Sequence, residues 1–138
     1  MKGYKTNIER ETSANNNFRK VVYTGTHLQL VLMSLGAGED IGEEVHKNTD
    51  QFFRFESGSG KCIIDDHEYR VKGGDVVIVP AGARHNIINT NHHEELKLYT
   101  LYAPPQHKDG VVRATKEDAE EKKEKYDRKP TEQLMSVY

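Results

Sequence analysis

The chain has 138 residues, which is room for one folded domain with its own core and little else. Its formal charge of -2 at pH 7 gives no bulk field that would attract nucleic acid or an anionic membrane. The single cysteine, Cys62, excludes an internal disulfide and fits a buried strand better than a reactive thiol. No apolar run approaches the length of a membrane span, and the polar N-terminus is unlike a signal peptide, so we expect a cytoplasmic protein.

Short β-rich runs separated by Gly, Pro, Asn and Asp dominate the chain from about residue 20 to 104, whereas residues 1–19 predict an extended arm or loop. We expect strands at residues 21–24, 27–35, 43–46, 51–56, 61–65, 68–72, 75–79, 85–89 and 94–102. Their number and spacing predict an all-β barrel or sandwich, and no internal repeat indicates a solenoid.

The pattern of apolar residues in two of these runs predicts which strand faces are buried. The run 27–35 is apolar on both faces, so we expect one face inside and the other under a neighbouring sheet or subunit. Alternation sets Gln51, Phe53 and Phe55 on one face of their strand and Phe52 on the other. Apolar surface left outside predicts a homodimer.

The segment 106–138 is expected to be a loop, a charged helix and a tail within the same domain, which spans residues 1–138. Thr115 and Asp118 have the spacing of a capping box, so a short C-terminal helix should begin there and run to Asp127. This run has almost no apolar stripe, which is typical of a solvated surface helix.

The most informative stretch runs from Gly74 to Asn89. It reads as a buried strand, a turn at Pro80 and Gly82, and a second strand that starts near His85. The spacing G-x5-P-x-G-x2-H-x3-N keeps all five fixed residues of the second cupin motif. On these residues the chain resembles the cupin family.

The resemblance covers roughly residues 20–104 and implies a cupin jelly-roll barrel with a metal ion near its centre. It does not imply one reaction, because cupins include dioxygenases, sugar isomerases and epimerases, lyases and non-catalytic binding modules. Short members similar to this chain are often labelled mannose-6-phosphate isomerase-like.

The first cupin motif, G-x5-H-x-H-x3,4-E-x6-G, can be placed here in two registers. In one, His46 is the first histidine and an asparagine replaces the second, which leaves one residue too few before Gln51. In the other, the motif opens at Gly38, Glu44 takes the first histidine's place, and Gly58 closes it. The second register reproduces every spacing, so we prefer it.

The resemblance in this register implies a metal site formed by Glu44, His46, Gln51 and His85. Glu44 and His46 lie two apart, so they point the same way from one strand. The ligand charge is -1, as in the family's usual three histidines and one glutamate. Two nitrogens and two oxygens favour manganese or iron(II), with zinc, nickel and copper left open. Gln51 fits equally well as a residue that orients a bound water.

A pocket beside this metal needs an apolar wall, which we expect from Phe53, Phe55, Tyr99 and Tyr102. The first hypothesis is a metal-dependent enzyme acting on a small oxygen-rich molecule, by sugar-type isomerase or epimerase chemistry or by dioxygenase chemistry. The alternative is a non-catalytic cupin that binds a small ligand, with a structural metal or none. The neutral Gln51 and the lack of an identifiable general base favour the alternative.

Overall fold

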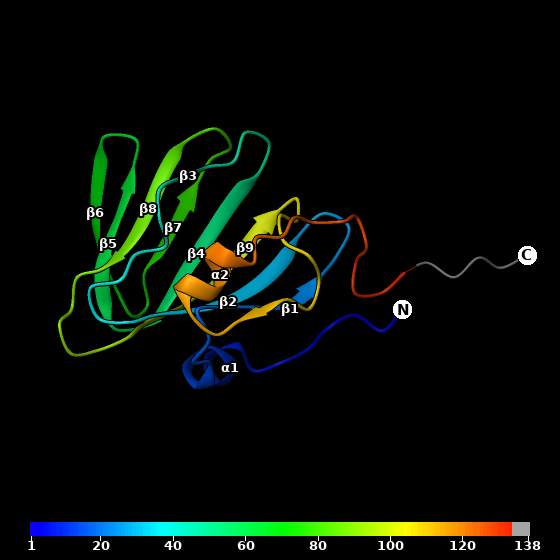
Figure 1. Cartoon of the computed structure of the whole chain (residues 1–138), viewed down its shortest axis with the longest axis horizontal. Coiled ribbons are helices and arrows are strands. Elements are labelled where there is room, and N and C mark those ends of the chain that lie inside the picture. The colour runs from blue at the N-terminus through cyan, green and yellow to red at the C-terminus, as the bar shows by residue number, and fades with distance from the viewer. Residues whose placement is uncertain (134–138) are drawn as a thin grey trace, which may run out of the picture.

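The computed structural model describes residues 1–133, which form two antiparallel β-sheets and two short helices (Figure 1). The larger sheet has the strand order β10-β1-β2-β9-β4-β7, and the smaller has the order β3-β8-β5-β6. The expected all-β jelly-roll architecture with a short C-terminal helix is confirmed.

The elements run in chain order as α1 (Ile8–Ala14), β1 (Arg19–Thr24), β2 (Gln29–Leu35), β3 (Glu44–Val45), β4 (Asp50–Ser57), β5 (Ser59–Ile64), β6 (His67–Lys72), β7 (Val76–Val79), β8 (Arg84–Asn89), β9 (Leu96–Ala103), β10 (Val112–Arg113) and α2 (Lys116–Glu121). Strands β1 to β9 fall on the nine expected runs, with boundaries shifted by at most two residues. Strand β10 lies where a loop was expected, because its two residues pair with the start of β1.

The turns that separate these strands use backbone conformations that the sequence indicated. Asp65, in the hairpin between β5 and β6, has φ +50°, and Gly82, between β7 and β8, has φ +90°. Strand β9 ends at Ala103, directly before Pro104.

The core lies between the inner faces of the two sheets. Its central part is apolar and fully buried, with side chains that include Val31, Met33, Leu35, Phe53, Phe55, Ile87, Leu96 and Leu98. Buried polar side chains also face inward, namely Gln29, Gln51, His85 and Thr100, beside Tyr102. Burying polar groups is costly unless they find partners, so this polar part of the interior is where a site is expected.

The N-terminal segment contains a helix rather than the extended arm or loop expected from its polar composition. Asn7 caps α1 by accepting a hydrogen bond from the Arg10 backbone N at 3.0 Å. The helix packs against β2, β4 and β9, Thr12 is buried, and Lys97 of β9 donates to the Asn15 carbonyl. The chain itself therefore covers part of the outer face of β2, for which a neighbouring sheet or subunit was expected.

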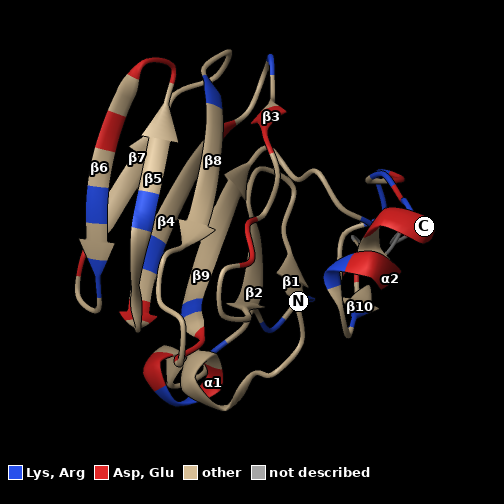
Figure 2. Cartoon of the chain, turned by 60° about the vertical axis from the view of Figure 1, so that its left-hand side comes forward, with Lys and Arg blue, Asp and Glu red and all other residues tan. Residues whose placement is uncertain are grey.

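Helix α2 begins as predicted and ends earlier than predicted. Thr115 Oγ1 accepts a hydrogen bond from the Asp118 backbone N at 3.0 Å, which confirms the cap. The helix ends at Glu121 instead of Asp127, and the Lys122 carbonyl accepts a hydrogen bond from Arg113 at 2.8 Å. The chain then leaves the helical path beside β10 (Figure 2). The rest of the expected tail, residues 134–138, lies outside the described residues.

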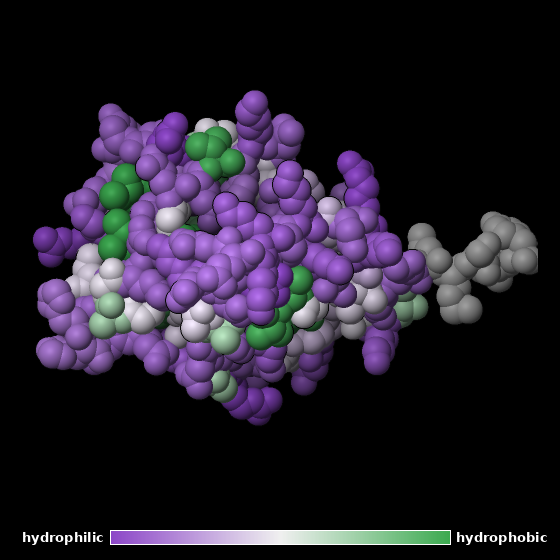
Figure 3. All heavy atoms as spheres, viewed as in Figure 1, coloured by the Kyte–Doolittle hydropathy of each residue, from purple (hydrophilic) through white to green (hydrophobic). Residues whose placement is uncertain are grey.

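The face of the molecule seen in Figure 3 is largely hydrophilic, and its hydrophobic groups are small and separate. Neither helix of the described chain has the length and apolar character needed to cross a membrane.

Gly58, which closes the first motif, is predicted to be required for its close contact with β9. It has φ +89°, and an added Cβ would lie 2.4 Å from the Glu95 carbonyl oxygen. Gly74 has a similar φ of +97° with nothing within 4 Å, so it is the matched control. We expect Gly58→Ala to lower the free energy of unfolding by about 1–3 kcal/mol more than Gly74→Ala, measured by chemical denaturation. Equal losses would contradict this reading.

Candidate metal centre

The turn between β7 and β8 is bonded to the segment that leads into β4. The Gly82 backbone N donates to the His46 carbonyl at 2.8 Å, and the Ala81 backbone N donates to Asp50 Oδ1 at 2.8 Å. These two contacts join the segments that carry the first and second motifs. They fix where the side chains of both motifs enter the interior.

His85 and Gln51 face each other in the interior. The exposed fractions are 5% for His85 and 3% for Gln51, and His85 Nε2 lies 3.2 Å from Gln51 Oε1. His85 Nδ1 lies 3.1 Å from the Ala83 carbonyl oxygen, while Gln51 Nε2 donates to Thr100 Oγ1 at 2.9 Å. Because a carbonyl oxygen only accepts, Nδ1 carries the proton and neutral Nε2 presents a lone pair.

Two acceptors therefore face each other across 3.2 Å. Three things relieve this contact: a proton on His85 Nε2, a metal ion between the two atoms, or an amide turned so that its NH2 donates. Burial lowers the pKa of His85, which opposes the extra proton. The arrangement therefore fits a cation held between the Gln51 oxygen and the His85 nitrogen.

Glu44 and His46 form a second pair. Glu44 Oε2 lies 2.8 Å from His46 Nε2, yet this buried nitrogen has no well-directed hydrogen bond within residues 1–133. Burial raises the pKa of Glu44, but His46, Arg19 and His107 together lower it more, so the carboxyl stays ionised at neutral pH. A carboxylate and a nitrogen without a hydrogen bond, side by side, are donors that suit a divalent cation.

The two pairs are neighbours. Glu44 is paired with His85 in the register of β3 and β8, and the ring centroids of His46 and His85 are 5.6 Å apart. Over residues 1–133, no three His, Cys, Asp or Glu side chains meet as a metal-binding cluster. A metal ion here would therefore depend on the amide oxygen of Gln51 and on both pairs closing around it.

Three of the four expected pocket-wall residues lie inside the barrel. The rings of Phe53 and His85 are 6.1 Å apart, the rings of Tyr102 and His46 are 5.8 Å apart, and Phe55 is fully buried in the core. Tyr99 instead lies on the outer face, 6.3 Å from Phe52 between ring centroids. The pocket-lining role predicted for it is corrected, because residues an odd number apart in a strand face opposite sides.

A hydrogen-bonded chain beside the four donors was missed at the sequence level. His107 Nε2 lies 3.2 Å from the Tyr102 hydroxyl, and His107 Nδ1 lies 2.8 Å from Glu124 Oε1. His107 comes from the loop after β9 and Glu124 from the segment after α2. Neither residue has a motif spacing that could have indicated it, since only the folded chain brings them together.

A cleft of about 630 Å³ opens beside Glu44, between β1 and α2. Its lining is mostly charged and includes Arg19, Glu43, Glu44, His107, Lys116 and Glu124. This volume is typical of a site for a small molecule. The cleft therefore gives a ligand a route to the carboxylate of the candidate metal centre.

The family model for the Cupin domain matches residues 31–102, which is more than half of the chain. This chain belongs to the cupin family. The matched region runs from β2 to β9 and contains Glu44, His46, Gln51 and His85.

Relatives of this cupin include YrkC of Bacillus subtilis, an uncharacterized protein that is 48% identical over 124 residues. That match covers 86% of this chain and 66% of YrkC, so the chain spans about two thirds of its relative. The crystal structure of BH2720 from Bacillus halodurans is 41% identical, has a TM-score of 0.85, and is matched over 88% of this chain and 96% of its own.

A more distant relative is quercetin 2,3-dioxygenase of Bacillus subtilis. It is 29% identical over 89 residues, which are 64% of this chain and 26% of the dioxygenase. This similarity covers only about a quarter of the dioxygenase.

The buried His107 is predicted to make stability depend on pH. Burial lowers its pKa in the folded protein although Glu124 acts in the opposite direction, so the unfolded chain binds the proton more readily. Stability should therefore fall as the pH drops below about 6.5, by at most about 1.4 kcal/mol per pH unit for this residue.

Denaturant unfolding of metal-free protein between about pH 7 and pH 5.5 measures this slope. We expect a smaller slope in His107→Asn than in wild type. His67→Asn, at the exposed tip of the β5–β6 hairpin, should leave the slope unchanged. An unchanged slope in His107→Asn would contradict the assignment.

Proposed function

We propose that this cupin binds one divalent metal ion through Glu44, His46, Gln51 and His85 and is a metal-dependent enzyme acting on a small oxygen-rich molecule. The observation that carries the proposal is the pair of acceptors, His85 Nε2 and Gln51 Oε1, which face each other at 3.2 Å in the interior. A site that had evolved only for packing would place a donor against an acceptor there.

Two further features support a metal ion at this position. The Ala83 carbonyl holds the proton of His85 on Nδ1, which is the usual way in which a protein orients a histidine ligand. His46 Nε2 is buried without a hydrogen bond in the described chain, and ionised Glu44 supplies the negative charge beside it. Two nitrogens and two oxygens favour manganese or iron(II), and zinc and nickel also accept this set.

A bound metal would supply Lewis-acid polarisation of a substrate carbonyl or hydroxyl, or dioxygen chemistry if it is redox-active. The chain's own residues would enclose the reacting molecule: Phe53 and Tyr102 as walls, and the cleft beside Glu44 as the entrance. His107 holds the Tyr102 hydroxyl in place through its hydrogen bond.

Dioxygenase chemistry is supported by the similarity to a quercetin 2,3-dioxygenase. Sugar-type isomerase or epimerase chemistry, as the mannose-6-phosphate isomerase-like label implies, is the second member of this proposal. Consumption of dioxygen during turnover separates the two, because isomerisation and epimerisation leave dioxygen untouched.

A non-catalytic ligand-binding cupin is the alternative function, and the neutral Gln51 is the observation that favours it. Gln51 replaces the carboxylate that the family motif has at this position, and an amide is a weaker ligand. Ligands that raise the melting temperature without being converted would support this alternative.

Metal binding is predicted to depend on His85. Calorimetric titration of tag-free protein with Mn²⁺, Fe²⁺, Zn²⁺ and Ni²⁺ should show one site, and His85→Ala should weaken it more than about 100-fold. His67→Ala removes an exposed histidine from the β5–β6 hairpin and is the matched control. Equal affinity in wild type and His85→Ala would overturn the proposed site.

The enzymatic part of the proposal has its own test with the same protein. Complete chelation should abolish turnover of any substrate found, and readdition of the tightest-binding metal should restore it. Turnover that survives full removal of the metal would contradict a metal-dependent mechanism.

We also propose, from the sequence, that the protein is cytoplasmic, forms a homodimer and binds a small molecule. The apolar side chains that could meet a second copy are Tyr69, Val76 and Ile78, which are exposed on β6 and β7 at the ends of the two sheets. We expect a dimer in analytical ultracentrifugation at micromolar concentration and a monomer for Ile78→Lys. A monomeric wild type would contradict the proposal.

A further inference from the structure

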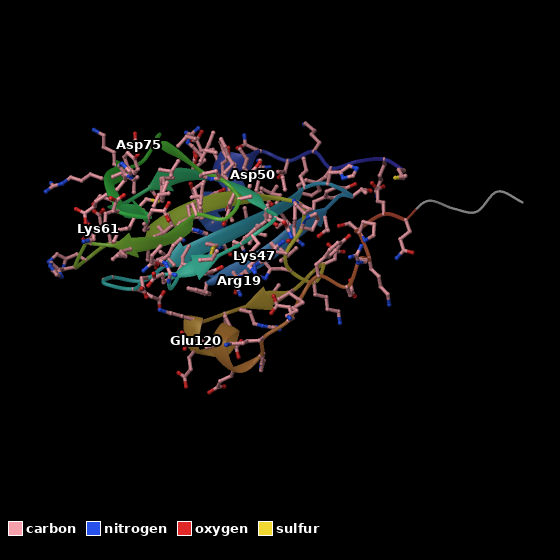
Figure 4. The ribbon with its side chains drawn as sticks, turned by 90° about the horizontal axis from the view of Figure 1, so that it is seen from above. Arg19, Lys47, Asp50, Lys61, Asp75 and Glu120 are labelled. Carbon is pink, nitrogen blue, oxygen red and sulfur yellow. The ribbon has the colours of Figure 1, made fainter. Side chains whose placement is uncertain are left out.

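Arg19 is a buried cation that lies over the Phe18 ring, 5.5 Å from its centroid, but makes no ion pair among the described residues. It is the first residue of β1, only 9% of it is exposed, and it lines the cleft together with Glu44 and His107. Its Nε is buried without a hydrogen bond, and no carboxylate in residues 1–133 forms an ion pair with its guanidinium. Figure 4 shows Arg19 on the side of the β-structure that faces α2, which carries Glu120.

Several acidic groups around the cleft already have partners. Glu43 pairs with Arg84 at 3.0 Å, and Glu124 pairs with His107 at 2.8 Å. Glu44 lies 2.8 Å from His46. Glu44 and Glu124 place negative charge near Arg19, but neither carboxylate is within ion-pair distance of the guanidinium. A buried N–H group without a hydrogen bond is costly, so this guanidinium points to an anion that arrives with a ligand.

We propose that Arg19 binds the carboxylate of an anionic, oxygen-rich substrate in this cleft. This proposal rests on the proposed function in one respect: the metal centre at Glu44 and His85 is where the reacting part of the substrate would lie. The planar guanidinium offers parallel N–H groups that match the two oxygens of a carboxylate.

The charges of the cleft favour a carboxylate over a phosphate. Lys116 of the lining is paired with Asp40, and Lys123 and Lys125 are exposed to solvent, whereas Glu44 and Glu124 place negative charge near the ligand. Arg19 is the buried cation of the lining, and one guanidinium balances one negative charge, whereas a phosphate would bring close to two. A substrate with one carboxylate group is therefore the best electrostatic match.

Three probes with the same small polyol skeleton test this choice: glycerate, glycerol and glycerol 3-phosphate. Their affinities are measured by NMR titration of metal-free protein in chelator, so that no metal can bind the anion. We expect glycerate to bind most tightly to wild type, and Arg19→Met to weaken it at least about 10-fold with glycerol unaffected. Arg70→Met, on an exposed position of β6, is the matched control and should change nothing.

The melting temperature without ligand is a second measurement, because a purely structural role of Arg19 predicts that Arg19→Met lowers it. Without ligand, Arg19→Met should unfold at the same temperature as wild type or at a higher one, because an unpaired buried charge is removed. Arg19→Lys keeps the positive charge but loses the two parallel N–H groups, so it should bind glycerate with intermediate affinity. Lower stability of Arg19→Met together with unchanged glycerate affinity would overturn the proposal.

Other outcomes are also decisive. Tighter binding of glycerol 3-phosphate than of glycerate would overturn the choice of a carboxylate, and so would equal affinity for glycerate and glycerol. His85→Ala should keep its Arg19-dependent glycerate affinity in chelator. The experiments can therefore contradict the proposed anion site and the proposed metal site independently of each other.

Discussion

The hydrogen bond from the Gly82 backbone N to the His46 carbonyl, 2.8 Å long, is the contact on which the candidate metal centre depends. It joins the turn before β8 to the segment before β4, and the bond from Ala81 N to Asp50 Oδ1 supports it. Gly82 has φ +90°, which a residue with a side chain rarely adopts, so the second motif needs glycine there. The motif residues thus serve first to position the backbone, and the donor side chains follow from that position.

The buried polar groups of this cupin differ in whether they have hydrogen-bond partners. Asn89 of the second motif donates to the carbonyls of Leu35, Gly36 and Glu94, so its role is to hold loops against the barrel. Buried polar groups of this kind are paired. Four buried side-chain atoms of the described chain lack a hydrogen bond: Thr12 Oγ1, Glu56 Oε2, His46 Nε2 and Arg19 Nε. The last two belong to the four donors and the cleft. We propose His46 Nε2 as a ligand for a cation and Arg19 as a partner for an anion.

Much of the barrel could be predicted from the sequence because its signals are local. Alternation placed Gln51, Phe53 and Phe55 on the inner face, and Thr115 marked the start of α2. Tyr99 was assigned to the wrong face because an aromatic residue was taken as pocket-lining without applying the same alternation to β9. Helix α1 was missed because its polar sequence has no apolar stripe, and packing against β2, β4 and β9 decides its structure.

The parts of the site that escaped prediction depend on contacts between distant segments. Glu124 meets His107 across 17 positions, and Arg19 of β1 lines the same cleft as residues of α2 and the segment after it. No spacing within one strand encodes such contacts. The two cupin motifs, in contrast, specify their geometry within a few residues, and this is why the sequence could indicate that His46 and His85 lie close together.

Histidine side-chain ¹⁵N NMR during titration with Zn²⁺ tests the central claim most directly, because it reports each ring nitrogen separately. We expect the Nε2 resonances of His46 and His85 to shift together at one equivalent of metal, with His85 Nδ1 still protonated. The exposed histidines should stay unchanged. Shifts confined to other histidines, or no shift at His85, would contradict a metal centre in this barrel.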